Sequence, residues 1–222
     1  MIRQSKTGIS SFELSRHLGV NYDKAWLLHN KILWAMSDRD DASVLRGKIQ
    51  IDDAYFGGEQ PVGKAVRGSE IIFIVVAFSV NEAGHPVHAK IIPVAGFSSE
   101  AIATWARDHL NPGSADLSDE LASFRSIAQQ VAVTRSSSTV ASTPTIFHSF
   151  AGVRCWATSR SSLNGTFHAF IFDKYARNYL GGHCFRSNRR FSLPEMTERI
   201  ANVVCCYTPC TERQFRVAEA FW

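Results

Sequence analysis

The chain has 222 residues, 45% of them hydrophobic and 20% charged, which is enough for one good core and a small additional module. Its net charge of +4 is compatible with a polyanionic partner but does not demonstrate one. No apolar run is long enough to cross a bilayer, and the first residues lack the layout of a signal peptide, so we expect a cytoplasmic protein without a membrane partner. Five cysteines without a Cys-x-x-Cys pair indicate neither a disulfide framework nor a zinc site.

Two helices are predicted near the N-terminus. Ser10 followed by Glu13 is a capping box that begins the first helix, and Gly19 ends it. A second helix is predicted over residues 22–36, where apolar side chains recur with helical spacing. The pair therefore forms a helical hairpin.

This hairpin, residues 1–37, fits a helix-turn-helix, whose second helix lies in the major groove of DNA. Asn21, Tyr22 and Lys24 at the start of that helix are the candidate DNA contacts. Many helical hairpins that bind no DNA have the same pattern, so the alternative stays open. The polar segment 38–47 is interpreted as a linker.

An acidic pair follows the first predicted strand. Within residues 48–59, Ile49 and Ile51 alternate with polar residues and lead into Asp52 and Asp53, and an aromatic pair and a double glycine follow. We therefore expect a strand that ends in a turn, with the acids at the strand end. Side chains alternate along a strand, so only one of the two carboxylates can face a shared site. A polar turn without chemistry is the alternative interpretation.

Two more strands and a helix are predicted next. A strand buried on both faces is predicted over residues 71–78, and a hairpin turn over residues 81–84 leads into the returning strand, residues 88–94. The helix is predicted over residues 98–110. Three strands followed by a helix is the opening order of an RNase H-like fold. The predicted fold class is therefore α/β, with an RNase H-like core over 48–200 preceded by the helix-turn-helix and followed by a helical tail over 201–222.

Asp119 is a second candidate acid. It precedes a predicted helix that begins at Leu121, and side chains at such strand-to-helix junctions converge at one edge of a sheet. Asp52 and Asp119 on adjacent strand ends would hold Mg²⁺ (or Mn²⁺) for displacement at a phosphodiester, with a third ligand from a later helix. A carboxylate that merely stabilises the helix N-terminus is the alternative for Asp119.

Several short motifs occur along the chain in a definite order. The first motif consists of residues 8–10, residues 26–29 and Met36, and the second and third are residues 51–58 and 118–124. Residues 165–168 with Tyr175 and residues 179–180 form the fourth, and residues 185–191 form the last. As an ordered series they resemble bacterial insertion-sequence transposases with an ISXO-type DDE domain, the insertion-sequence group numbered fifteen-ninety-five.

The resemblance implies an RNase H-like fold in which Asp52 and Asp119 are the first two metal-binding carboxylates. It implies strand cleavage at element ends and strand transfer into target DNA, by a homo-oligomer bound to double-stranded terminal repeats and associated with the nucleoid when bound. It assigns a catalytic role to His168. The remaining matched positions, which face DNA phosphate or the active site, are Arg186, Arg189 and Arg190; a solvated basic helix is their alternative.

The chain departs from the family in two places. The family's N-terminal zinc ribbon has no counterpart, so we expect an N-terminal truncation. The family's third ligand, an Asn in a Gly-Asn-Leu-Lys motif before residues 165–168, is also missing, and Asn164 is the possible substitute. Residues 131–160 contain no Asp, Glu, Lys, Asn, Gln or Leu. We interpret this segment as a frame-shifted translation, since the codons of residues 155–157 force Leu-Gly in the shifted frame; a disordered linker is the alternative.

Three functions are compatible with these features. The first is an insertion-sequence transposase whose catalysis is impaired in this copy. The second is a catalytically dead remnant that still binds DNA. The third, a transcription regulator with a ligand-sensing domain, requires an apolar pocket instead of converging carboxylates.

Overall fold

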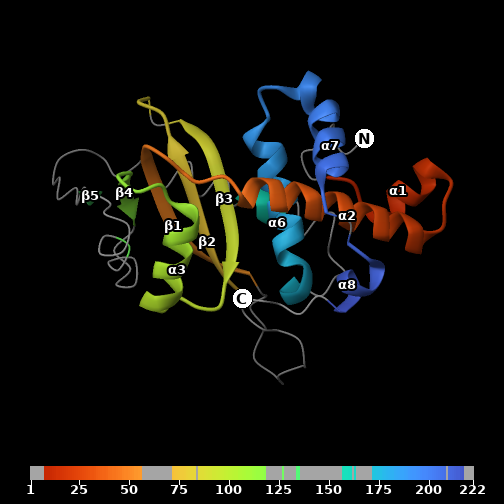
Figure 1. Ribbon diagram of the computed structural model, residues 1–222, viewed down its shortest axis with the longest axis horizontal. Coiled ribbons are helices and arrows are strands. Elements are labelled where there is room, and N and C mark those ends of the chain that lie inside the picture. Colours follow the sequence, from red (N-terminus) through yellow and green to blue (C-terminus); the bar gives the residue numbers. More distant parts are fainter. Residues whose placement is uncertain are drawn as a thin grey trace. The chain divides into compact units, whose positions relative to one another are not determined.

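The structure is a computed structural model, and it describes residues 8–56, 72–83, 85–118, 127, 134–135, 157–161, 163, 172–208 and 210–217. The chain divides into two compact units. The helical unit comprises Met1–Ser43 and Cys155–Phe221, and the sheet unit comprises Val44–Arg154. Each unit has its own set of elements, labelled in Figure 1.

The sheet unit is built on a five-stranded sheet with the order β3-β2-β1-β4-β5 (Figure 1). The strands are β1 (Lys48–Phe56), β2 (Ile72–Val80), β3 (Pro86–Val94), β4 (Ala115–Ser118) and β5 (Thr134–Arg135). β2 pairs antiparallel with both β1 and β3, whereas β4 pairs parallel with β1 and with β5. The sheet is therefore mixed, with a meander on one side of β1 and parallel strands on the other.

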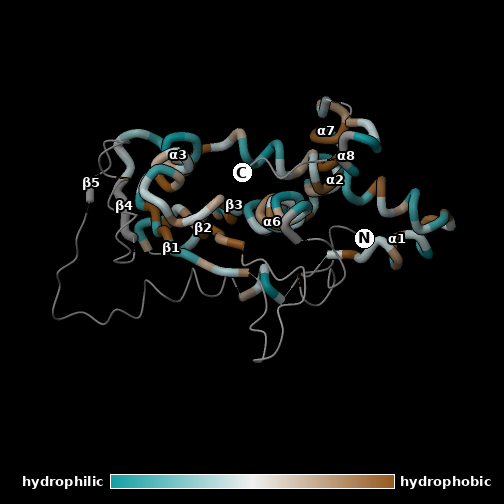
Figure 2. The backbone as a smooth tube through the Cα atoms, turned by 90° about the horizontal axis from the view of Figure 1, so that it is seen from below, coloured by the Kyte–Doolittle hydropathy of each residue, from teal (hydrophilic) through white to brown (hydrophobic). Residues whose placement is uncertain are grey.

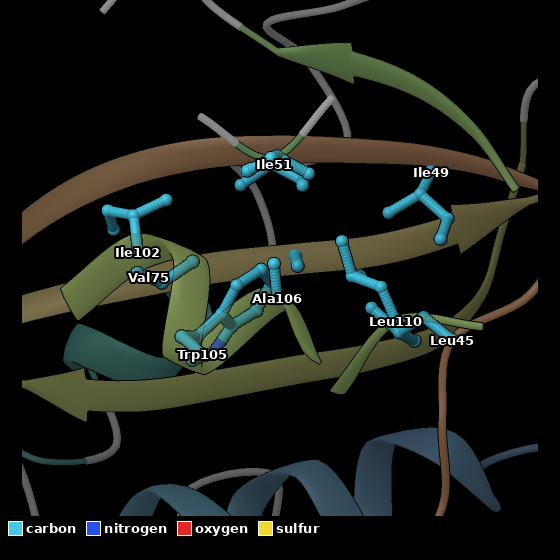
Figure 3. Packing of buried hydrophobic residues seen from close by; sticks show 10 residues of the cluster. Leu45, Ile49, Ile51, Val75, Ile102, Trp105, Ala106 and Leu110 are labelled. Atoms are coloured by element: carbon cyan, nitrogen blue, oxygen red, sulfur yellow. The ribbon is translucent and has the colours of Figure 1, made fainter. Parts of the chain in front are cut away.

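Helix α3 (Ser99–His109) covers one face of this sheet. The Ser98 hydroxyl accepts a hydrogen bond from the Ala101 amide at 3.2 Å and begins the helix, as predicted. The helix buries Trp105 and its apolar neighbours against Ile51 and Val75 (Figure 3). Strand β2 carries the hydrophobic colour in Figure 2, and each buried aliphatic or aromatic side chain contributes about 1.5–3 kcal/mol. This core fixes β1 in place.

Strand β1 is longer than predicted. It pairs with β2 along its whole length, from Lys48 opposite Val80 to Phe56 opposite Ile72. The expected strand end at the acids is therefore wrong, as is the alternative of a polar turn there, and Asp52 lies within the strand. The reason is cross-strand pairing: Tyr55 stacks edge-to-face on Phe73, with ring centroids 5.8 Å apart, and this extends the ladder beyond the acids. The double glycine that was expected to form the turn lies outside the described residues.

The helical unit contains the predicted hairpin. Its elements are α1 (Ser11–Leu18), α2 (Tyr22–Asp41), α6 (Phe172–Asn188), the 3₁₀ helix η2 (Leu193–Glu195), α7 (Met196–Cys206) and α8 (Glu212–Val217). The Ser10 hydroxyl accepts from the Glu13 amide at 3.1 Å, and Gly19 ends α1 with φ of 65°, which confirms both predicted helix signals.

Helix α2 continues beyond its predicted end at Met36 through Asp41, so it includes the first residues of the segment interpreted as a linker. Its C-terminal half packs closely on α6. A Cβ at Gly181 would lie 2.2 Å from Ser37 Oγ, and one at Gly182 would lie 2.5 Å from Leu33 Cδ2. The paired glycines allow this close approach, which no local signal in residues 37–41 reveals.

Two residues of the compositionally unusual segment 131–160 belong to the sheet. Thr134 and Arg135 of β5 are opposite Ala115 and Asp116 of β4. Residues 157–160 are helical, and the rest of the segment lies outside the described residues. Where the structure describes the chain, no helix is long and apolar enough to span a membrane. Its four described cysteines are free thiols.

Candidate functional site

Asp52 is half-buried on the central strand of the sheet. Alternation along β1 places it with Gln50 and Ala54 on the face opposite the one that α3 covers, because Ile49 and Ile51 belong to the α3 core. Its strand neighbour on β2 is Val76. Backbone hydrogen bonds to β2 make this a rigid position for a carboxylate.

The register between β1 and β4 bears on the second acid. Ile51 of β1 is opposite Ser118 of β4 in the parallel pair. Asp52 directly follows Ile51 in the sequence, and Asp119 directly follows Ser118. Asp119 itself lies outside the described residues, as do Asn164 and His168. Among the residues that are described, no three His, Cys, Asp or Glu side chains group together as a metal site.

Asp53 has a different environment from Asp52. It is on the α3 side of the sheet, where it forms a side-chain hydrogen bond with Tyr55. Partial desolvation, followed by the Asp53 charge and this hydrogen bond, raises the pKa of the Tyr55 hydroxyl. The prediction that the two acids point in opposite directions agrees with this alternation, and Asp53 has a local partner of its own.

The three predicted DNA contacts at the start of α2 lie on its exposed first turn. Tyr22 and Lys24 are exposed. The Asn21 side chain caps the helix, because its Oδ1 accepts a hydrogen bond from the Lys24 amide at 3.0 Å. Asn21 therefore has a structural role in positioning the other two side chains.

Arg189 has a buried protein partner. Its Nη1 atom donates to Asp40 Oδ1 at 2.7 Å, and Asn188 Nδ2 donates to Asp40 Oδ2 at 2.9 Å. The side chains of Asp40 and Arg189 are 5% and 19% exposed. The guanidinium also lies over the Phe185 ring, 3.7 Å from its centroid. These contacts join the ends of α2 and α6, so Arg189 has a packing role that its motif alone does not reveal.

Arg186 interacts electrostatically with two buried histidines of the same unit, His29 and His183. Burial lowers the pKa of its guanidinium to about 10. Burial, and then the Arg186 charge, lower the pKa values of His29 and His183 to about 4 each. His29 Nδ1 also lies 3.1 Å from the Ser11 hydroxyl, which links α1 to α2. Arg186 is therefore a semi-buried cation beside neutral imidazoles.

Arg190 is at the turn that follows α6. Its Nη1 atom donates to the Ser187 carbonyl oxygen at 2.9 Å, and its guanidinium lies 4.4 Å from the centroid of the Phe191 ring. Both residues are presented by the helical unit at its surface. The three arginines of the motif thus have three different environments.

Several of these residues were missed by sequence reasoning. Asp40 lies in a segment interpreted as a linker, His29 was matched only as part of the motif 26–29 without a role, and His183 lies outside the motifs. The one usable signal was Gly181-Gly182 in the middle of a helical pattern, because glycine there indicates close packing against another helix. The identity of the partner helix has no signature in the sequence.

The chain matches a protein-family model, the ISXO2-like transposase domain, over residues 44–188. Since the match covers more than half of the chain, the chain belongs to the ISXO2-like transposase family. No curated protein gives a significant match. The match confirms the family that the motifs within residues 44–188 resemble. It supports a transposase function and, by resemblance, an enzyme of the DNA nucleotidyl-transfer class. The N-terminal truncation and the shifted frame stay predictions.

Proposed function

We propose that this ISXO2-like transposase binds the terminal repeats of an insertion sequence, cleaves DNA strands there and transfers them into target DNA, with Asp52 and Asp119 as its metal-binding carboxylates. The observation that carries this proposal is the parallel register of β1 and β4. Ile51 is opposite Ser118, and an acid follows each of these residues directly in the sequence. Adjacent parallel strands would bring two such carboxylates to one site.

The strand order supports an RNase H-like core. A three-stranded antiparallel meander, β1 to β3, is followed by α3 and by parallel strands on the other side of β1. In this arrangement β1 is central and carries Asp52 away from the α3 core. The α3 core stabilises the strand, and the opposite face carries the carboxylate among buried apolar residues such as Val76.

The donor set fits a divalent metal ion. Carboxylate oxygens are the hard ligands that Mg²⁺ and Mn²⁺ prefer. The Asp52 carboxylate lies on strand β1, which is hydrogen-bonded to β2 on one side and to β4 on the other. When bound, the metal supplies Lewis-acid stabilisation of the phosphoryl oxygens and activates the attacking group. The strand fixes the position of the Asp52 carboxylate oxygens, which are the proposed metal donors. Asn164 is proposed as a substitute third ligand, and His168 as a catalytic residue near them.

The helical unit supplies the proposed DNA contacts. Tyr22 and Lys24 lie exposed at the start of α2, and Arg190 lies at the turn after α6. We also propose Asn21, at the start of α2, and Arg189, at the end of α6, as DNA contacts, and each of them stabilises the fold through the contacts described above. Oligomerisation on DNA follows from the need to act at two element ends.

A second candidate function is a DNA-binding remnant without catalysis. The observation that favours it is the absence of any Asn, Asp or Glu from residues 131–160, where the family's Gly-Asn-Leu-Lys motif belongs. Two carboxylates alone hold two metal ions poorly. Nucleotide sequencing of the gene between the codons for Gln130 and Ser161 separates a damaged copy from a divergent one.

The direct test is a nicking assay on a supercoiled plasmid that carries the DNA flanking the gene. We expect nicking in Mg²⁺ or Mn²⁺ that Asp52→Asn abolishes. Asp53→Asn is the matched control, because this neighbour has the same chemistry but lies on the α3 side of β1. Equal loss in both variants would indicate damage to the strand instead of the site.

DNA binding is measured on the same flanking DNA over a range of salt concentrations. Salt-dependent binding without nicking in either metal would identify the remnant. Failure of the wild-type chain to bind this DNA more tightly than unrelated DNA would contradict both functions. The two measurements together separate a defect in chemistry from a defect in recognition.

A further inference from the structure

The turn between α6 and η2 presents an aromatic ring to solvent. Phe191 is 86% exposed, which makes it the most exposed large hydrophobic side chain among the described residues; the next, Phe12, is 55% exposed. Burying a phenylalanine contributes about 1.5–3 kcal/mol, and the fold forgoes that contribution here. A single exposed apolar residue needs no explanation by itself, so the surroundings of the ring decide its meaning.

The backbone on both sides of Phe191 is held by hydrogen bonds. The Arg190 amide donates to the Ser187 carbonyl at 3.3 Å, and the Ser192 amide donates to the Arg189 carbonyl at 2.9 Å. The adjoining side chain of Arg189 is tied to Asp40. The ring is therefore carried by an ordered turn instead of a loose loop.

One face of the ring has a cation beside it. The Arg190 guanidinium lies 4.4 Å from the ring centroid, while Nη1 of the same group donates to the Ser187 carbonyl oxygen at 2.9 Å. The Arg190 guanidinium covers one face of the Phe191 ring, and the side chain is still 86% exposed. The other face of the ring is therefore open to a partner. The geometry suits a flat ligand that stacks on that open face.

The charge around the turn favours an anionic partner. Arg190 places a guanidinium beside the ring, 4.4 Å from its centroid. The carboxylate that follows in the chain, Glu195, forms an ion pair with Arg199 at 2.6 Å. The charge of Arg189 is balanced by Asp40 at 2.7 Å. A nucleotide combines a flat π-surface for Phe191 with a phosphate for Arg190, which is the usual composition of a single-strand binding platform.

We propose that Phe191 is a stacking platform for an unpaired base of DNA, with Arg190 beside it to contact the adjacent phosphate. The proposal rests on the proposed function, since it adds a positioning residue for DNA at a strand end. A phenyl ring offers no hydrogen bonds, so the stacked base can be of any type. The paired strands of a duplex leave no unstacked base for the ring.

The test uses the purified full-length chain and a short single-stranded oligonucleotide that contains one 2-aminopurine, with its fully paired duplex as the comparison. Stacking quenches 2-aminopurine fluorescence, and fluorescence anisotropy of an end-labelled copy gives the affinity. The wild-type chain is expected to quench the single strand. Phe191→Leu keeps an apolar side chain but removes the ring, so it should abolish the quenching and weaken single-strand binding at least about fivefold, the lower limit for one stacked base.

The variant series separates stacking from other causes. Phe191→Trp should retain the quenching, and Phe191→Leu should leave duplex binding within about twofold of wild type. Phe12→Leu is the matched control, because Phe12 has a guanidinium, that of Arg16, at the same 4.4 Å from its ring centroid. It should change neither readout.

Three results with the Phe191→Leu variant would overturn the inference. Quenching by Phe191→Leu equal to wild type excludes stacking on this ring. Equal weakening of single-strand and duplex binding assigns Phe191 to general DNA contact. A lower mass of Phe191→Leu in sedimentation, with unchanged DNA binding, assigns the ring to a contact between protein copies. If the wild-type chain binds neither single-stranded nor duplex DNA, the proposed function fails together with the inference. If the wild-type chain binds DNA but the Phe191 variants behave as described above, only the inference fails.

Discussion

The sheet unit and the helical unit are stabilised by different kinds of contact. In the sheet unit, α3 and β1 to β3 bury a continuous apolar cluster. In the helical unit, α2 and α6 are joined by two closely packed glycines and by the ion pair between Asp40 and Arg189. Apolar contacts tolerate adjustment, whereas buried charges and close backbone contacts tolerate little.

The largest effect is expected in the sheet unit. Ile51→Ala removes a buried side chain from the α3 core, so we expect the free energy of unfolding to fall by about 3–4 kcal/mol. Urea denaturation measures this change. Val87→Ala on exposed β3 surface is the control and should cost less than about 0.5 kcal/mol. Similar losses for both would mean that the cluster does not stabilise the sheet.

A neighbouring pair of acids tests the polar contacts of the helical unit. Asp40→Ala leaves Arg189 without its buried partner, so we expect a loss of about 3 kcal/mol. Asp41→Ala removes the same group from an ion pair with Arg177, whose side chain is 52% exposed, and should cost less than about 1 kcal/mol. Urea denaturation of both variants compares them directly. If Asp41→Ala cost as much as Asp40→Ala, burial would not be the cause.

Acid is expected to weaken the helical unit selectively. The pKa of His29 is lowered from 6.5 to about 4, so the unfolded chain binds a proton between these values that the folded chain does not. Stability is therefore complete above pH 6.5 and falls as the pH decreases towards 4. From pH 7 to 5 this histidine should account for about 2 kcal/mol.

The measurement is urea denaturation of wild type and His29→Gln at both pH values. The variant should lose about 2 kcal/mol less than wild type over this interval, because glutamine does not titrate. His183, with the same lowered pKa, continues to titrate in the variant and keeps part of the pH dependence. An identical pH dependence of the two proteins would show that His29 is not held neutral.

The smallest effect concerns the glycine contact between α2 and α6. Gly181→Ala places a Cβ 2.2 Å from Ser37 Oγ and 2.8 Å from Ser37 Cα, so the helices must separate. Alanine gains helix propensity, which offsets part of the cost, and the expected net loss is about 1–2 kcal/mol by thermal or urea denaturation. Gly96→Ala, with no atom within 4 Å of the added Cβ, is the control. Stabilisation by Gly181→Ala would contradict the close contact.

Local signals in the sequence determined much of both units. The Ser10 and Ser98 caps, the end of α1 at Gly19 and the apolar runs of β2 and β3 act within a few residues. Such signals depend on hydrogen bonds and side-chain patterns close along the chain, so they can be recognised without the fold. The motifs added the family to which the chain belongs. The pairing of Asp52 with Asp119 at a metal site stays a prediction.

Only the tertiary structure decided how far the elements extend and what the charged residues contact. β1 continues past Asp52 because β2 pairs with it, and α2 continues to Asp41 because α6 supplies partners for its last acids. It also decided that Arg189 meets Asp40 while Arg190 supports an exposed ring. These outcomes depend on residues far apart in the sequence, whose pairing free energy exists only when the chain has folded.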